Sequence, residues 1–301
     1  MSQIYLTSCV GLDHDIVLLD AFVRHYLDLG IRKENFLLVL NTSERGQVST
    51  RIKEAIEILD RYGIEPFDIW CTRYESQEKW ARVHAVLNKV VKPEDWVVHP
   101  DADEFHEITK STFKELFDDY DTRGINAAQG VLIDRITEDL TVPSEHKYGD
   151  VFSMFPVCAN LSGLLGITGV KLMCYRGYLR ANNGSGQVHA QLKDKVNYCH
   201  GGTASLHEHP TAVKYLGTYQ PQNPRQPENW TTIVDEIRQE IGLLVHHFKW
   251  HGRCIEKLDQ RIETYTKLKR AQVFQSSRVL EHYRTNGKFK LIDATVKKDI
   301  I

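Results

Sequence analysis

The sequence lacks any long hydrophobic run. No stretch approaches the roughly 20 consecutive apolar residues that a membrane-spanning helix needs. The N-terminal residues also lack a positively charged segment followed by an apolar core, so they do not resemble a secretory signal. We therefore expect a cytoplasmic protein. If it contacts a membrane at all, we expect a peripheral contact with the inner face.

The sequence also lacks an excess of charge of one sign, and its cysteines are not arranged in closely spaced pairs. The 38 Lys and Arg residues nearly balance the 40 Asp and Glu residues, so a net charge of −2 gives no global field for nucleic acid, and no nucleic-acid partner is expected. The six cysteines contain no C-x-x-C pair, and their scatter argues against a zinc knuckle and a disulfide framework. A chain of 301 residues can bury a sizeable core without such staples.

Strand-like and helix-like segments alternate along the first hundred residues. Short apolar, β-rich runs are separated by stretches with apolar residues at helical spacing. The predicted strands are 3–10, 35–40, 67–70 and 96–99, and the predicted helices are 15–29, 48–62 and 78–91. This alternation predicts an α/β fold with a mostly parallel, Rossmann-like sheet flanked by helices. Later segments are less regular, with a helix at 113–120, a strand at 127–133 and a charged helical stretch at 254–283.

Three carboxylates follow the fourth predicted strand within four residues. They are Asp101, Asp103 and Glu104, in the sequence WVVHPDADEF that begins at Trp96. Gathering like charges costs free energy unless a cation or solvent compensates. Hard oxygen ligands suit Mg²⁺ or Mn²⁺, which can bridge protein and phosphate. In parallel sheets ligands bind beyond the carboxyl ends of the strands, so this position favours a metal site over a solvated acidic turn.

The pattern W-x-x-x-x-D-x-D-E-F resembles the metal-site motif of GT-A glycosyltransferases, in particular their family 2-like and family 92-like branches. Two weaker stretches agree: DHDIVLLDAFVRHYLDLG at 13–30 resembles the opening helix of that branch, and HHFKW at 246–250 is similar to its late H-Y-x-x-K/S segment. The resemblance covers residues 1–110 and, loosely, 125–265. It implies a GT-A fold and an enzyme that moves a sugar from a UDP- or GDP-linked donor to a glycan or lipid-linked acceptor, with inversion.

The resemblance also implies Mn²⁺ or Mg²⁺ as cofactor and a metal-ligand set. Asp103 is expected to bind the metal directly, while Asp101 contacts ribose or a metal-bound water. Glu104 is expected to bind the metal or to orient a neighbour. His247 corresponds to a late histidine ligand, with His246 as the alternative; a packed histidine without a metal role is an equally good interpretation.

The predicted domain division also follows the resemblance. Residues 1–250 are expected to form the catalytic domain, with a donor half at 1–105 and an acceptor half at 106–250, and 251–301 a helical segment. Donor contacts are expected at the ends of the first two strands and around the third helix, where Lys and Arg can meet phosphate. These contacts are Thr7, Ser8, Cys9, Asn41, Arg73, Lys79 and Asp101.

The general base is left open between Asp134, His189 and Asp194. Asp134 ends a predicted strand and is expected to face the sugar pocket, while His189 and Asp194 follow a flexible stretch, 182–187, placed like an acceptor loop. The triplet His207-Glu208-His209 is not expected to bind zinc, because adjacent residues suit a loop better than a zinc site.

Two other classes of function stay open. A metal-dependent nucleotidyltransferase also uses spaced carboxylates, but no Gly-rich phosphate loop with Lys or Arg occurs near the N-terminus. A catalytically inactive, glycan-binding relative is the other class, although the D-x-D-E sequence is intact.

The C-terminal helical stretch carries both apolar and basic residues. Its apolar set is expected to dock on the catalytic domain. Its basic set is either an ordinary solvated face or a peripheral contact with an anionic membrane. That basic set is Lys257, Arg261, Lys267, Lys269, Arg270 and Arg278.

Overall fold

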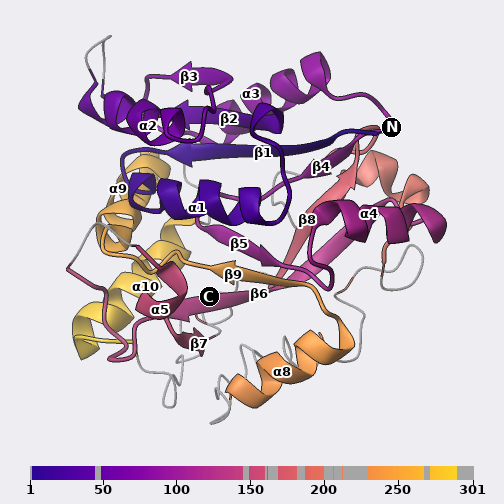
Figure 1. Ribbon diagram of the computed structural model, residues 1–301. Helices are drawn as coiled ribbons and strands as arrows, with labels where there is room; N and C mark the ends of the chain where they lie inside the picture. Colours follow the sequence, from indigo (N-terminus) through magenta and orange to yellow (C-terminus); the bar gives the residue numbers. More distant parts are fainter. Residues whose placement is uncertain are drawn as a thin grey trace.

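A central sheet with helices on both faces forms the body of the protein (Figure 1). The computed structural model describes residues 2–44, 49–144, 149–159, 161, 169–181, 187–199, 206, 212, 230–267 and 272–289. Within these ranges the sheet has nine strands, in the order β3-β2-β1-β4-β8-β6-β9-β5, with β7 paired to β6. The α/β class that we predicted from the alternation of segments is confirmed.

The first part of the chain is a parallel β/α series. Its elements are β1 (Ile4–Gly11), α1 (Ile16–Asp28), the 3₁₀ turn η1 (Lys33–Asn35), β2 (Phe36–Asn41), α2 (Thr50–Asp60), β3 (Asp68–Trp70), α3 (Ser76–Val90) and β4 (Trp96–Val98). Strand β1 pairs in parallel with β2 and β4, and β2 pairs in parallel with β3. The carboxyl ends of these strands therefore meet at one edge, where ligands bind in such sheets.

The second part mixes parallel and antiparallel strands. Its elements are β5 (Glu104–Glu107), α4 (Phe113–Thr122), β6 (Ala127–Ile136), α5 (Val151–Met154), β7 (Val157–Ala159), β8 (Val170–Arg176), the 3₁₀ helix η2 (Ala190–Lys195), α8 (Trp230–Glu240) and β9 (Leu244–His247). Strand β8 lies antiparallel between β4 and β6. Strand β9 runs parallel to β6 and antiparallel to β5, which places the acidic turn after β4 beside the end of β9.

The two faces of the central strands bury separate apolar cores, because successive side chains of a strand point to opposite faces. Leu38 and Leu40 of β2 join the core that α1 and α4 cover, whereas Leu37 and Val39 join the core that α3 covers. Burial on both faces explains why β2 is a continuous apolar run rather than an alternating one.

The charged stretch at the C-terminal end contains two helices, α9 (Cys254–Lys267) and α10 (Gln272–Asn286). A third apolar core holds them to the sheet, as expected for the apolar face of this stretch. Its members include Ile136, Trp250, Leu258, Val279, Leu280 and Phe289. Helix α9 thereby lies next to the carboxyl end of β9, in the orange part of the chain in Figure 1.

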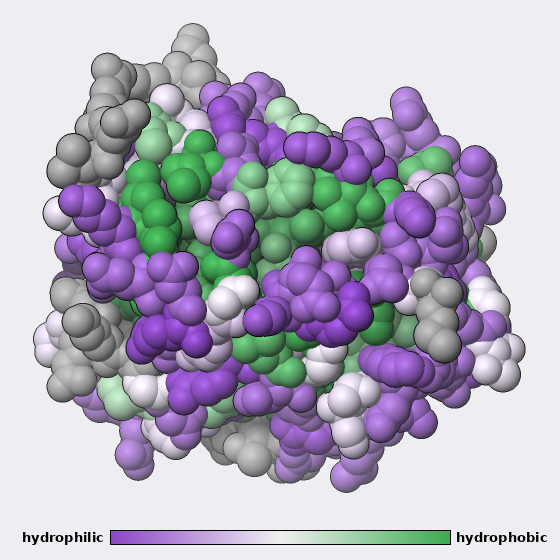
Figure 2. All heavy atoms as spheres, turned by 45° about the horizontal axis from the view of Figure 1, so that its top comes forward, coloured by the Kyte–Doolittle hydropathy of each residue, from purple (hydrophilic) through white to green (hydrophobic). Residues whose placement is uncertain are grey.

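The surface is mostly hydrophilic, and hydrophobic side chains gather toward the centre of the face in Figure 2. Within the described ranges, the large hydrophobic residues that are exposed are Phe67, Ile69, Tyr178 and Phe274. No helix in those ranges is both long and apolar enough to span a bilayer.

The stacked aromatic pair under α4 gives a test of this core. Phe117 is buried, and its ring stacks on that of Trp96 at a centroid distance of 4.2 Å. We expect Phe117→Ala to lower the free energy of unfolding by about 3–5 kcal/mol, because it leaves a cavity and removes the stacking partner. Urea unfolding measures this loss, with the exposed Phe274→Ala as control; equal losses in the two variants would contradict the packing described.

Candidate functional site

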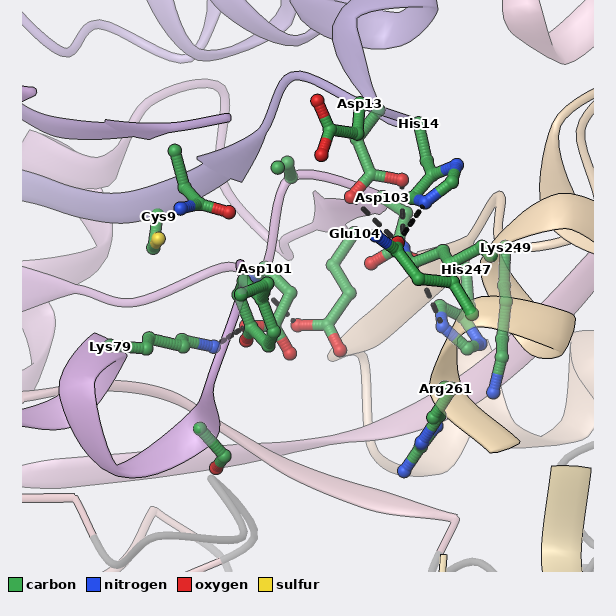
Figure 3. A pocket seen from close by; sticks show the side chains of 18 of the residues that line it. Cys9, Asp13, His14, Lys79, Asp101, Asp103, Glu104, His247, Lys249 and Arg261 are labelled. Carbon is green, nitrogen blue, oxygen red and sulfur yellow. Dashed lines mark hydrogen bonds and ion pairs between the residues drawn. The ribbon is translucent and has the colours of Figure 1, made fainter. Parts of the chain in front are cut away.

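A cavity of about 630 Å³ lies at the carboxyl ends of β1, β2 and β4 (Figure 3). The turn after β4, the start of α3, the end of β9 and helix α9 supply its wall. Charges of both signs line it in equal number, five carboxylates and five Lys or Arg side chains. These are Asp13, Asp15, Asp101, Asp103, Glu104, Lys79, Lys171, Lys249, Lys257 and Arg261.

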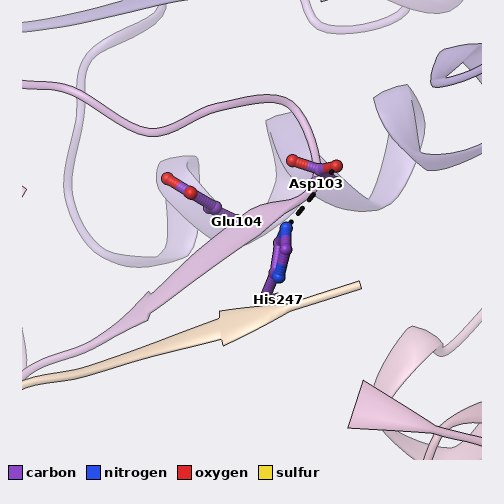
Figure 4. Close-up of side chains that lie close together, drawn as sticks. All are labelled: Asp103, Glu104 and His247. Atoms are coloured by element: carbon purple, nitrogen blue, oxygen red, sulfur yellow. Dashed lines mark ion pairs between the residues drawn. The ribbon is translucent and has the colours of Figure 1, made fainter. Parts of the chain in front are cut away.

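Two carboxylates and one imidazole in this cavity lie close enough to share an ion. Ligand atoms of Asp103, Glu104 and His247 all fall within 4.8 Å of one another, and each residue is buried (Figure 4). The antiparallel register of β5 and β9 places Glu104 opposite His247. The donor set fits a divalent cation: carboxylate oxygens suit Mg²⁺ and Mn²⁺, and the imidazole nitrogen makes Mn²⁺ the better match of the two.

The buried carboxylate of Asp134 orients the ring of His247. Its Nδ1 lies 2.8 Å from Oδ1 of Asp134, which also accepts a hydrogen bond of 2.9 Å from Nε1 of Trp250. The carboxylate accepts a hydrogen bond from Nδ1–H, which leaves Nε2, 3.8 Å from Asp103 Oδ2, as the ring nitrogen on the side of the ligand cluster. Metal-binding histidines are commonly held in this way by an outer carboxylate.

Asp103 keeps its negative charge because cations surround it. Lys257 Nζ lies 3.1 Å from Asp103 Oδ2 and contacts both carboxylate oxygens of Asp15 at 2.7 and 2.9 Å. Burial raises the pKa of Asp103, but Lys257 and His247 outweigh burial and hold that pKa below its usual range. The ionised carboxylate is the form that binds a metal.

Asp101 and Glu104 share Lys171 of β8. Its Nζ lies 3.0 Å from Asp101 and 2.8 Å from Glu104, and Lys79 of α3 forms a second ion pair with Asp101. Burial raises the pKa of Asp101 as well, but Lys171 and Lys79 bring it well below the usual range. For Glu104 burial dominates and raises the pKa, so an added cation would favour its ionised form.

The structure places four of the predicted donor contacts on the cavity wall: Cys9, Asn41, Lys79 and Asp101. Asn41 uses its amide to donate to the backbone oxygens of Trp70 and Thr72, so this side chain holds the loop after β3.

The other three donor candidates are not on the wall. Thr7 and Ser8 are buried within β1 and are not among the lining residues. Arg73 instead forms an ion pair of 3.0 Å with Glu263 of α9.

The three candidate bases are spread over two places. Asp134 is fully buried beneath His247 and is not among the lining residues, contrary to our expectation that it faces the pocket. His189 precedes η2 and accepts from the backbone N–H of Gln191, while Asp194 is exposed on η2; neither lines the cavity. Residues 182–186 and 207–209 lie outside the described residues.

The alternative ligand His246 has its own partner. Its Nε2 lies 2.8 Å from Glu107, so it faces away from the cluster of three ligands. Two residues of the predicted basic face, Lys257 and Arg261, point into the cavity instead of outward. Residues 268–271 and the side chain of Lys267 are outside the described part of the chain.

Several residues that line the cavity were not predicted as site residues from the sequence. Asp13 and Asp15 follow β1 at the edge where ligands bind, and that position was a usable signal. Lys171 enters through the antiparallel strand β8, which no local pattern places beside β4. Lys249 is buried, and burial together with the nearby Arg261 lowers its pKa to about 8.

Comparisons with known proteins add little to this geometry. No protein-family model and no curated protein matches the chain. Among solved structures it is similar to S. aureus TarS 1-349, with TM-score 0.33, 12% identity, and coverage of 98% of this chain and 76% of that one. A second S. aureus TarS structure gives TM-score 0.30 and 13% identity over 98% of this chain and 46% of the other.

A 4-diphosphocytidyl-2C-methyl-D-erythritol synthase gives TM-score 0.33 and 15% identity, over 73% of this chain and 98% of that one. At such low identities and TM-scores, these similarities establish no activity, substrate or family for this chain.

The contact between Glu107 of β5 and His246 of β9 makes the stability of the fold depend on pH in a testable way. Burial raises the pKa of Glu107, but hydrogen bonds from His246 and Arg238 outweigh it and bring this pKa to about 2. A carboxyl whose pKa is lower in the folded than in the unfolded state stabilises the fold above the unfolded pKa, and this stability is lost as the pH falls toward the folded pKa.

We therefore expect Glu107→Gln to lose less stability than the wild type between about pH 5 and pH 3. Urea midpoints at both pH values measure the difference. Exposed Asp118→Asn serves as the control, and an identical pH dependence in wild type and Glu107→Gln would refute the role given to this contact.

Proposed function

We propose that this protein is a GT-A-type glycosyltransferase that uses Mn²⁺ or Mg²⁺ and transfers a sugar from a UDP- or GDP-linked donor to a hydroxyl of a glycan or lipid-linked acceptor. The observation that carries the proposal is the convergence of Asp103, Glu104 and His247 within 4.8 Å at the edge of the cavity. These residues come from the D-x-D-E-F segment and the late HHFKW segment, which lie far apart in the sequence.

Asp103, Glu104 and His247 would hold the metal, and Asp134 would keep Nε2 of His247 directed toward it. A divalent cation there would supply Lewis-acid stabilisation to the diphosphate leaving group. Sugar transfer passes through an oxocarbenium-like state, so stabilising the departing phosphate contributes most.

The donor would lie along the ends of β1 and β2. Cys9 and Asn41 would border the nucleoside, and Asp101 would accept from a ribose hydroxyl while Lys79 and Lys171 hold its carboxylate in place. Residues 1–105 would thus supply most donor contacts and 106–250 the acceptor site, although His247 and Lys171 of the second half would serve the donor side. Lys257 and Arg261 of the C-terminal segment also line the cavity. Proton acceptance by His189 or Asp194 would require η2 to approach the cavity.

Product analysis separates this function from its two alternatives. We expect release of free sugar from one of a panel of UDP- and GDP-sugars with Mn²⁺, and none with a chelator. Release of pyrophosphate from nucleoside triphosphates would instead support the nucleotidyltransferase. Nucleotide-sugar binding without turnover would support the inactive relative.

Asp103→Asn tests the metal site directly. Because it removes a negatively charged ligand, we expect kcat/KM for Mn²⁺-dependent donor hydrolysis to fall by about 100-fold or more, equivalent to about 2.7 kcal/mol. The exposed Asp118→Asn on α4 should retain wild-type activity. Undiminished hydrolysis by Asp103→Asn would remove the metal assignment.

Asp134→Asn tests the positioning of His247. An amide in place of the carboxylate weakens the preference for a proton on Nδ1, so we expect the affinity for Mn²⁺ to fall by about 10–100-fold. Titration calorimetry with Mn²⁺ measures it, alongside the melting temperature without metal. A lower melting temperature with unchanged Mn²⁺ affinity would show that Asp134 only supports packing.

A further inference from the structure

The cations of the cavity divide into two groups. Lys79, Lys171 and Lys257 each form ion pairs with carboxylates of the wall. Lys249 and Arg261 differ: within the part of the chain that the structure describes, neither forms an ion pair or a side-chain hydrogen bond, although both line the cavity. Two of the five basic side chains of the wall are therefore not in direct contact with a carboxylate.

The position of Lys249 makes this lack of a partner costly. The residue lies between β9 and α9 and is only 7% exposed, with Nζ 5.3 Å from the ring of Trp250. An ammonium group loses several kcal/mol of hydration on burial, and a π face returns only part of that loss. Such a group is expected to have a counter-ion in the functional state.

Arg261 adds a second positive charge to the same region. It projects from α9, and its guanidinium lies 6.0 Å from the centre of the Tyr265 ring. Figure 3 shows the side chains of Lys249 and Arg261 extending toward the same end of the pocket, with their charged tips below His247 and the labelled carboxylates in this view. The two cations repel each other, and an anion between them would remove both the repulsion and the burial cost.

The residue types indicate the kind of anion. A guanidinium presents a planar fork that matches two oxygens of a phosphate, and an ammonium acts as a compact point charge. A phosphate dianion balances the two positive charges, whereas the carboxylates of the wall repel anions from the metal-ligand cluster as long as no cation is bound there.

We propose that Lys249 and Arg261 form an anion subsite, separate from Asp103, Glu104 and His247, that binds a phosphate group of the substrate. That the bound molecule is a substrate rests on the proposed function. The phosphate has two sources, the diphosphate of the donor or a phosphate carried by the acceptor.

Binding of inorganic pyrophosphate in the presence of EDTA tests the subsite without the metal. We expect saturable binding to the wild type by titration calorimetry. Lys249→Met and Arg261→Met should each raise Kd by at least about tenfold, because each removes a charged hydrogen-bond donor. Lys193→Met, on exposed η2, is the matched control and should bind as the wild type does.

Stability without ligand gives an independent measurement. Replacing an unpaired buried cation by an apolar side chain of similar length should keep or raise the urea midpoint of the ligand-free protein. A lower midpoint for Lys249→Met would show that the ammonium group has a structural partner and would overturn the proposal. So would absence of pyrophosphate binding to the wild type, or equal binding by the wild type and both variants.

Two phosphate compounds then distinguish the sources. Weakened binding of UDP or GDP in both variants assigns the subsite to the donor, and weakened binding of glycerol 3-phosphate with unchanged nucleotide binding assigns it to the acceptor. Asp103→Asn should still bind pyrophosphate in EDTA. The two proposals can therefore be refuted separately. Loss of pyrophosphate binding with Mn²⁺-dependent donor hydrolysis intact would contradict only the anion subsite, and absence of hydrolysis with pyrophosphate binding intact would contradict only the proposed function.

Discussion

The antiparallel pairing of β5 with β9 is the constraint on which the site depends. Its register sets Glu104 opposite His247, and the backbone N–H of Phe248 extends the pairing by donating to the carbonyl oxygen of Asp103 at 2.7 Å. Residues about 140 positions apart in the sequence thereby come within ligand distance of one another. Glu107 and His246 form a further contact at the other end of the two strands, so the alignment is held on both sides of the ligand pair.

The buried carboxylates around this strand pairing are paired with groups of opposite charge or with hydrogen-bond donors. Beneath the ligands, Asp134 fixes one nitrogen of His247 and so determines which nitrogen faces the cavity. Beside them, Lys171 and Lys257 neutralise carboxylates that would otherwise repel one another. Since breaking a buried ion pair leaves an uncompensated charge, these lysines stabilise the arrangement that could receive a metal. A cation that enters must share Asp103 with Lys257, which couples metal binding to the position of α9.

Helix α9 makes the C-terminal segment part of the cavity. Trp250 and Leu258 anchor it through an apolar core shared with the sheet, and this anchoring directs Lys257 and Arg261 inward. The basic residues that we interpreted from sequence as a solvated or membrane-facing surface thus include two that face the candidate site. Helical periodicity identifies a face of a helix, but the partner of that face depends on how the helix packs.

The amino-acid sequence determined the local elements and the edge where the site lies. The β/α alternation predicted β1 to β4 within a residue or two at most boundaries, because strand and helix periodicities are local properties. It also placed Asp101 and Asp103 beyond the end of β4, since carboxyl ends of parallel strands share one edge. Only the tertiary structure decided the partners: β8 inserts antiparallel beside β4 and delivers Lys171, and β9 brings His247 over Asp134. These pairings join distant segments through backbone hydrogen bonds that any residue can make, so the order of strands leaves no local pattern in the sequence.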